Sequence, residues 1–417
     1  MLSVKTKSLL FFLWNALLVA ALAVVLASTL KHLTEIAEEF MLELAAVYTA
    51  GLFLFPLAGL ILIYYLRKRV FKGKKNKGIK EIYNTLSYRK ESLPWYKVPS
   101  HYINGFLTVI SGGSTGIEVS TVVATAAIGA NMQRVGKSAK KHRSALICAG
   151  VAAGIATLFS SPLAGGLFAL EVIARKRDRL IWVAVGIGSA VAGGAMYLEG
   201  REYLFDAEVL FWKWQAVPYF IVVSLLGGIC AVYFTKTVLF FKERLGSLEN
   251  NCTRICIAAL LLGGLLVMFP QLYGDSYHAV PEFLVMNPEM TGMSHTIPLL
   301  LLLIFLKPLA ASLTLGGGGD GGVFAPSIVT GAFIGLFVAL VGNRYFGTDL
   351  VPVNFALIGA ATMLSAAIHA PLTALFLACS IVKGGYVLFG PMLVAVYLAK
   401  HTAQYLYGYT VYTYRKA

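Results

Sequence analysis

Long apolar runs, separated by short polar segments, recur along the whole chain. They cover residues 9–28, 46–66, 217–241, 253–270, 297–315, 326–346 and 383–407. Each run approaches or exceeds the ~20 residues that a helix needs to cross a bilayer, and none shows the alternating pattern of membrane β-strands. No small-residue cleavage site follows the first run, so we expect it to remain as a helix. The pattern predicts an all-α polytopic membrane protein.

Two further apolar stretches are interrupted near their middle and are similar to one another. Residues 145–173 contain Ser160-Ser161-Pro162, and residues 353–380 contain His369-Ala370-Pro371. They align without a gap at an offset of 209 residues, so that the two prolines coincide. Such interruptions predict broken helices, and the basic clusters that flank the first stretch predict that it enters the membrane and returns.

A second pair of related segments lies upstream of these stretches. Residues 116–120 (GIEVS) and 322–326 (GVFAP) align at an offset of 206 residues. The chain is thus predicted to be a single membrane domain, 1–417, with a first repeat half, 1–203, and a second, 204–417. Broken helices in corresponding positions of two repeats are typical of transporters, whose binding site lies where these helices meet.

Charged residues are sparse and unevenly placed. They make up 13% of the chain, against 58% hydrophobic residues, and the net charge is +15. Residues 67–80 hold eight Lys or Arg and no acid, whereas residues 31–43 hold four Glu. Because Lys and Arg collect in cytoplasmic loops, this pattern predicts cytoplasmic termini and residues 31–43 outside, and it explains the basic excess without nucleic acid. The five scattered cysteines favour core packing and predict no metal site.

One short segment, Gly112–Gly116 (GGSTG), literally matches the G-x-S-x-G turn of serine hydrolases. A nucleophile at Ser114 needs His and Asp partners that are positioned by the fold. The candidate histidines lie in no recognisable partner motif; they are His101, His142, His278 and His369. We therefore expect that the protein is not an enzyme, and labelling of Ser114 by a fluorophosphonate would argue for the hydrolase alternative.

Glu118 follows that turn and places a carboxylate inside an apolar segment. A carboxylate in such a place costs several kcal/mol unless it is protonated, paired or facing water, so it is a functional candidate. The residues from Val119 onward are a plausible helix start, where backbone N–H groups and the helix dipole favour an anion. A carboxylate can fill such a site and leave it when protonated. The alternative is a structural Glu118 paired with a Lys or Arg.

The second half supplies a comparable helix start in Gly316–Pro326 (GGGGDGGVFAP). Pro326 suits a first helical turn because it has no N–H to lose there. No Gly-Lys-Ser/Thr follows the glycines, so a nucleotide-binding loop is not expected.

Together these segments resemble the CLC family of chloride channels and chloride/proton antiporters. Gly116-Ile117-Glu118 is similar to the family's glycine-x-glutamate motif, and Gly322–Pro326 satisfies its G-x-F-x-P motif. Pro162–Gly165 (PLAG) and the segment around Tyr412 match family segments as well, and the matches keep the family order over about residues 76–413. The resemblance implies the CLC-type inverted repeat with broken and re-entrant helices. It also implies a homodimer in a bacterial cell membrane, with one anion pathway per subunit. Little more than residues 412–417 follows the last apolar run, so no appended soluble domain is expected.

The resemblance also implies roles for individual residues. Glu118 corresponds to the external gating glutamate, which carries a proton. The implied anion-binding residues are Tyr412, Val323, Phe324, Ala325, Gly116, Ile117 and Lys77. The implied partners are small inorganic anions, chloride first, and protons, and no cofactor or metal is implied.

Two departures from the family pattern bear on the mechanism. Asn76–Glu81 (NKGIKE) aligns with the family's G-S-G-I-P-E, so Lys77 stands where an anion-binding serine is usual. Lys77 either brings a full charge to the inner anion site or remains a solvated lysine of the basic segment. Val172 stands at the position of the internal proton-transfer glutamate, with Glu171 one residue before it. We expect chloride/proton exchange, with a passive voltage- or pH-gated chloride channel and a fluoride/proton antiporter as alternatives.

Overall fold

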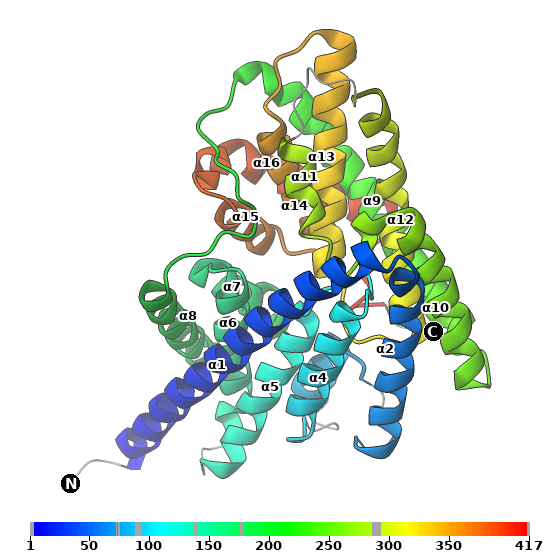
Figure 1. Ribbon diagram of the computed structural model, residues 1–417. Helices are drawn as coiled ribbons and strands as arrows, with labels where there is room; N and C mark the ends of the chain where they lie inside the picture. The colour runs from blue at the N-terminus through cyan, green and yellow to red at the C-terminus, as the bar shows by residue number, and fades with distance from the viewer. Residues whose placement is uncertain are drawn as a thin grey trace. The chain divides into compact units, whose positions relative to one another are not determined.

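The computed structural model describes residues 4–71, 73, 76–87, 93–136, 140–175, 178–285 and 293–414 (Figure 1). Over this part of the chain the regular structure is helical, apart from one isolated bridge between Glu208 and Lys383. Some residues of the basic segments that we predict to be cytoplasmic lie outside the described residues; they are 72, 74–75, 137–139 and 176–177.

The α-helices are α1 (Val4–Val47), α2 (Ala50–Arg69), α3 (Ile79–Ser87), α4 (Lys97–Ile110), α5 (Glu118–Val135), α6 (Arg143–Leu158), α7 (Pro162–Phe168), α8 (Arg179–Glu199), α9 (Val217–Gly246), α10 (Asn251–Met268), α11 (Ala279–Val285), α12 (Met293–Gly317), α13 (Phe324–Phe346), α14 (Pro352–Ile368), α15 (Pro371–Ser380) and α16 (Phe389–Leu406). The short elements are the 3-10 turns η1 (Lys140–His142), η3 (Trp214–Ala216), η4 (Pro270–Leu272) and η5 (Gly385–Leu388) and the π-helical turn η2 (Ala169–Ala174).

Eight helical segments of the described chain are long and apolar enough to cross a membrane; they contain α1, α2, α8, α9, α10, α12, α13 and α16. The seven uninterrupted runs of the sequence correspond to seven of them, which confirms the prediction of an all-α polytopic protein. The sequence pattern missed α8, because its four glycines dilute the apolar run. The two interrupted stretches became the pairs α6–α7 and α14–α15, which break beside Ser160 and His369.

The first helix is longer than the first apolar run. α1 spans 44 residues and includes the acidic residues 31–43, which we had placed outside as a segment between two crossings. At 1.5 Å per residue this helix is about 66 Å long, roughly twice the ~30 Å of a hydrocarbon core. No glycine or proline interrupts residues 29–47, so the backbone has no residue at which the helix would end.

The chain divides into two compact units. Unit 1 contains Met1–Ile36, Leu66–Phe106 and Ile117–Glu202, and unit 2 contains Ala37–Tyr65, Leu107–Gly116 and Tyr203–Ala417. The principal division, at residue 202, falls beside the predicted boundary between the repeat halves. However, Ala37–Tyr65 and Leu107–Gly116 belong to the first repeat half and yet pack within unit 2. The compact units and the sequence repeats therefore divide the chain differently.

In unit 1, α6 packs against both α5 and α8 (Figure 1). Glycine makes the α5–α6 crossing close. A side chain at Gly129 would lie 2.2 Å from the carbonyl oxygen of Leu146, and one at Gly150 would lie 2.5 Å from that of Thr125. Small residues at these positions let the two backbones approach, as is usual between membrane helices.

In unit 2, α13 and α14 make the corresponding crossing. A side chain at Gly335 would lie 1.8 Å from the carbonyl oxygen of Phe355, and one at Gly359 would lie 2.0 Å from that of Gly331. Gly335 follows Gly129 by 206 residues, and Gly359 follows Gly150 by 209 residues. The same glycine-mediated crossing is therefore built once in each unit.

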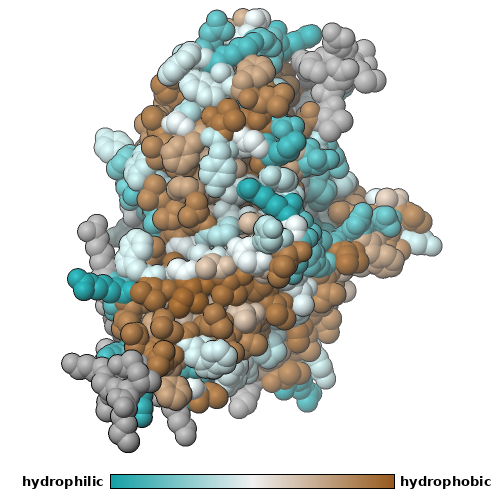
Figure 2. Space-filling model, turned by 90° about the vertical axis from the view of Figure 1, so that its left-hand side faces the viewer, coloured by the Kyte–Doolittle hydropathy of each residue, from teal (hydrophilic) through white to brown (hydrophobic). Residues whose placement is uncertain are grey.

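The surface carries the apolar side chains that a bilayer requires. Large hydrophobic areas cover much of the face in Figure 2, with hydrophilic residues gathered in smaller areas. On α1 alone, Leu10, Phe11 and Trp14 are each more than half exposed. Exposed apolar area of this extent is unfavourable in water and is typical of lipid-facing surfaces.

Candidate functional site

Glu118 is the first residue of α5 and is only 3% exposed. The turn before it begins at Gly112, whose φ of +82° is readily adopted only by glycine. Ile117, at the N-cap of α5, offers no side-chain hydrogen bond to the first turn. The helix start that we expect at this point is present, and it places a buried carboxylate where the helix dipole favours negative charge.

The second motif builds the same kind of helix start in unit 2. α13 begins at Phe324, which is 206 residues after Glu118, and its N-cap residue Val323 also makes no side-chain hydrogen bond. Val323, Phe324 and Ala325 are at most 1% exposed. By contrast, α8 and α10 are capped by the side chains of Asp178 and Asn250. Several other helices, such as α6, α9 and α14, also lack a side-chain cap, so this feature leaves the first turns of α5 and α13 open to an anion but does not single them out.

The turns that precede the two motif helices are joined within unit 2 by a reciprocal pair of hydrogen bonds. The N–H of Ser114 donates to Thr314 Oγ1 at 3.0 Å, and the N–H of Asp320 donates to Thr108 Oγ1 at 2.9 Å. Both donors and both acceptors are related by the same offset of 206 residues. Each repeat donates a backbone N–H to the equivalent threonine hydroxyl of the other repeat, which is the contact that a local two-fold symmetry produces.

Glycine brings these turns close together. A side chain at Gly321 would lie 2.3 Å from Thr115 Oγ1 and 3.3 Å from the carbonyl oxygen of Gly116. Gly318 has a φ of +115° and corresponds in the repeat to Gly112. The glycines of the two motifs therefore serve backbone approach and turn geometry within unit 2.

Ser114 does not have the surroundings of a hydrolase nucleophile. It is fully buried, and its hydroxyl accepts a hydrogen bond from the Lys307 ammonium at 2.8 Å. Lys307 also donates to the carbonyl oxygen of Gly274 and to the hydroxyl of Ser276, so all three ammonium protons have acceptors. An ammonium with this hydrogen bonding is not a base for a serine. In addition, the turn joins two helices, whereas a nucleophile elbow follows a strand.

A buried ion pair stands at the beginning of α3 in unit 1. Lys97 and Glu81, each 5% exposed, are joined by contacts of 2.9 and 3.0 Å, and His101 Nε2 lies 4.0 Å from the same carboxylate. Lys97 also donates to Asn76 Oδ1 at 3.0 Å. Sequence reasoning missed this group, although a lysine and a carboxylate in an apolar protein are the same signal that identified Glu118.

The side chain of Lys77 is exposed, and its backbone N–H donates to Glu81 Oε1 at 2.5 Å. This bond resembles the half of a capping box in which an acidic side chain reaches back to the helix start. Gly78 lies beside α5, since a side chain there would come within 3.3 Å of Val119 Cγ1. The start of α3 corresponds to the first family motif, and there the backbone N–H of Lys77 binds the protein's own Glu81 carboxylate.

Val172 lies in the π-helical turn η2 and is 1% exposed. Its carbonyl oxygen accepts a hydrogen bond from the Tyr83 hydroxyl at 2.9 Å, and Arg175 donates to that hydroxyl at 3.0 Å. Burial raises the pKa of Tyr83 to about 12, although nearby Arg175 acts in the opposite direction. π-Helical turns are rare and are frequently found at functional sites, and nothing in the sequence predicted this one.

The remaining predicted anion ligand, Tyr412, lies in the short turn that follows α16 and is 8% exposed. Thr410 and Thr413 fix this turn, because each side-chain hydroxyl accepts a hydrogen bond from the backbone N–H of the other residue.

The predicted site residues lie at two helix starts and in the turns before them. In unit 1 the structure places Ile117 and Glu118 at the start of α5. In unit 2 it places Gly116 in the paired turns, and Val323, Phe324 and Ala325 at the start of α13. The assignment of anion binding to these residues remains a prediction.

The family model for voltage-gated chloride channels matches residues 59–404 of this chain. The chain belongs to this family. Among curated proteins, the H(+)/Cl(-) exchange transporter ClcA of Vibrio campbellii is 26% identical over 393 residues, which cover 91% of this chain and 81% of the relative. The residues that the family model matches include both motif helices and the region between them.

Two solved structures share the fold over nearly the whole length. A slow cyanobacterial Cl⁻/H⁺ antiporter has a TM-score of 0.79 at 23% identity and covers 97% of this chain and 96% of its own. A CLC-type fluoride/proton antiporter has a TM-score of 0.76 at 21% identity, with 97% of each chain covered. The CLC-type fold predicted from the sequence is confirmed.

Proposed function

We propose that this protein carries chloride across the membrane in exchange for protons, with Glu118 as the protonatable gate. The observation that carries the proposal is the position of Glu118, a buried carboxylate at the first residue of a helix whose N-cap offers no side chain. The family membership supports anion transport, and the name of the Vibrio relative supports exchange for protons.

The proposed cycle follows from the chemistry of a helix start. When ionised, the Glu118 carboxylate occupies the place that the N–H groups and dipole of α5 favour for an anion. Protonation removes its charge, so chloride competes successfully for that place and the side chain leaves. Chloride is then held by backbone N–H groups of helix starts, among them those of Val323, Phe324 and Ala325, and by the hydroxyl of Tyr412.

The inner path of the proton distinguishes exchange from passive conduction. The Val172 side chain has no proton to transfer, and its carbonyl oxygen accepts a hydrogen bond from the Tyr83 hydroxyl. Two acids lie near this part of unit 1 in the chain: Glu171 directly precedes Val172 in η2, and Glu81 lies in α3. Val172 favours the passive alternative, a channel opened by protonation of Glu118. A fluoride/proton antiporter shares this fold, but the complete Gly322–Pro326 motif favours chloride.

Reconstitution into liposomes, with chloride and proton fluxes recorded together, tests the proposal. A chloride gradient should drive protons against their own gradient. Chloride flux without any proton movement would establish the passive channel, and fluoride flux that greatly exceeds chloride flux would establish the fluoride alternative. If neither anion moves, the proposal fails.

Replacement of Glu118 by glutamine tests the role of this residue. Glu118→Gln keeps the size and polarity of the side chain but carries no titratable proton, so chloride should still pass while proton movement falls to background. Glu249→Gln, at an exposed glutamate before α10, is the matched control and should retain coupled proton movement. Proton coupling that survives in Glu118→Gln would rule out the assignment.

Three coarser expectations accompany the proposal. The resemblance predicts a homodimer in a bacterial inner membrane with both termini in the cytoplasm, and the eight apolar helices support a multi-pass membrane protein. An enzymatic role for Ser114 is disfavoured by its hydrogen bond from Lys307. A fluorophosphonate probe should leave Ser114 unlabelled in the folded protein.

A further inference from the structure

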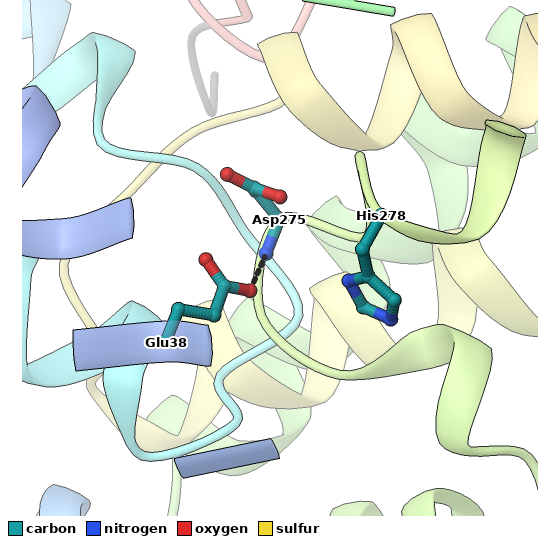
Figure 3. Close-up of side chains that lie close together, drawn as sticks. All are labelled: Glu38, Asp275 and His278. Atoms are coloured by element: carbon teal, nitrogen blue, oxygen red, sulfur yellow. Dashed lines mark hydrogen bonds between the residues drawn. The ribbon is translucent and has the colours of Figure 1, made fainter. Parts of the chain in front are cut away.

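Glu38, Asp275 and His278 form a side-chain cluster in unit 2, apart from the two motif helices (Figure 3). Glu38 extends from α1, and the other two side chains come from the loop between η4 and α11. One potential ligand atom from each of the three lies within 4.8 Å of those of the others. We propose that this cluster binds one divalent transition-metal ion of the zinc class.

The backbone holds both carboxylates in place. Glu38 Oε1 accepts the N–H of Asp275 at 3.2 Å, and Asp275 Oδ1 accepts the N–H of Tyr277 at 2.8 Å. Gly274 is required for this approach, because a side chain there would lie 1.7 Å from Glu38 Oε1. A carboxylate has two oxygens and about four acceptor positions, so a hydrogen bond to one oxygen does not by itself prevent a metal bond.

The kinds of donor atom determine which metal suits the site. Zinc bonds to imidazole nitrogen and carboxylate oxygen are about 2.0–2.2 Å long, so two ligand atoms of one ion lie at most about 4.4 Å apart. Small rotations of the three side chains reach this spacing. Two oxygens and one imidazole nitrogen favour zinc, cobalt or nickel over calcium and magnesium, which prefer oxygen alone. Three protein ligands leave a fourth position for water.

Access and charge are compatible with an ion from solution. Asp275 and His278 are partly exposed, whereas Glu38 is 7% exposed. The ammonium of Lys307 hydrogen-bonds to Gly274 and Ser276 in the same loop, and its repulsion of a dication is countered by the two carboxylates. A bound ion would join α1 to a loop that Lys307 already connects to Ser114, four residues before Glu118.

Metal titration of the purified protein tests the site. Tag-free protein in detergent, stripped with a chelator, is titrated with Co²⁺, whose visible absorption reports coordination, and Zn²⁺ is then used to displace it. We expect one ion per chain. His278→Gln and Asp275→Asn should each weaken binding at least about tenfold, since even the loss of a group that supports a ligand costs that much. Asp275→Asn keeps the oxygen that accepts from Tyr277, so its turn should remain intact.

A stability measurement and a control histidine complete the experiment. Zn²⁺ should raise the thermal midpoint of the unmodified protein and leave that of His278→Gln unchanged, because a ligand stabilises only a fold that binds it. The exposed His401 on α16 provides the control His401→Gln, which should bind like the unmodified protein. Three results would overturn the proposal: no stoichiometric binding, equal loss of binding in the control, or displacement of Co²⁺ by Ca²⁺ as readily as by Zn²⁺. None of these readouts depends on transport, so they are separable from the proposed function.

Discussion

Buried charge is the residue-scale feature that most distinguishes this protein from a plain helical bundle. Glu118, Glu81, Lys97 and Lys307 are all at most 5% exposed. The removal of a charge from water costs several kcal/mol unless hydrogen bonds or an opposite charge compensate for it. For Glu81, Lys97 and Lys307 the compensating groups are visible, and they fix the beginning of α3 and the turn that contains Ser114.

Replacing only one member of the Glu81–Lys97 pair should lower the free energy of unfolding more than replacing both members. Lys97→Met leaves the Glu81 carboxylate buried, so we expect it to lower the free energy of unfolding by about 3–5 kcal/mol. The double variant with Glu81→Met should recover part of this loss. Denaturant unfolding in mixed micelles measures both. The exposed pair Lys213–Asp349 supplies the control, because Lys213→Met should cost less than about 1 kcal/mol. A loss in the double variant equal to the sum of the losses in Lys97→Met and Glu81→Met alone would show that the two side chains are not coupled.

Tyr83 should stabilise the π-helical turn through its hydroxyl. Tyr83→Phe leaves the Val172 carbonyl without its donor, and we expect a loss of about 1–2 kcal/mol in the free energy of unfolding near pH 7. The exposed Tyr405, 91% accessible, gives the control Tyr405→Phe, which should change stability by less than about 0.5 kcal/mol.

The same tyrosine predicts a pH effect with a definite sign. The pKa of Tyr83 is about 12 in the folded protein, against about 10 when unfolded. Between these values the unfolded chain loses the proton while the folded chain keeps it, so stability falls as pH rises from 10 to 12. Unfolding curves across that range should fall more steeply for the unmodified protein than for Tyr83→Phe. Parallel curves would argue that Tyr83 ionises normally.

At the scale of elements, glycine decides how closely the helices cross. The α5–α6 and α13–α14 crossings use repeat-related glycines that face backbone carbonyls of the neighbouring helix. The carbonyls belong to helices and cannot turn away as a flexible side chain could. These positions therefore set the distance between the helices and not only their local conformation.

Gly335→Val should separate α13 from α14. The new side chain would meet the Phe355 carbonyl at 1.8 Å, and we expect the free energy of unfolding to fall by more than about 3 kcal/mol. Thermal unfolding of detergent-purified protein measures the change. Gly194→Val on α8 is the control, because nothing lies within 4 Å of that position. Similar midpoints for both variants would mean that the crossing tolerates a wider spacing.

The reciprocal turns predict equal effects from two distant threonines. Thr108→Val and Thr314→Val each remove the acceptor of one buried backbone N–H, and each should cost about 1–3 kcal/mol. The serine variants at the same positions keep a hydroxyl and should cost less than the valine variants. Denaturant unfolding measures the loss of free energy of unfolding in each valine variant. Unequal losses would show that the two equivalent hydrogen bonds do not contribute equally to stability.

At the scale of the whole molecule, the sequence predicted the architecture better than the polar interior. Apolar runs located most crossings because their length is set by the bilayer, and the repeat offsets of 206 and 209 recur in the helix starts at Phe324 and Pro371. The grouping of Lys307 with two serines and of Glu38 with His278 could not be predicted. Each group joins residues from distant segments, and no spacing in the chain records which of them meet.

The reciprocal bonds between the repeat turns also have a consequence for biosynthesis. The N–H of Ser114 has its acceptor on Thr314, so the turn before Glu118 is completed only after about 200 further residues have left the ribosome. At translation rates of roughly 5–20 residues per second, a nascent first half waits about 10–40 seconds for this partner. A truncated first half would therefore lack this hydrogen bond, and the turn before Glu118 would be completed only when the second half has been made.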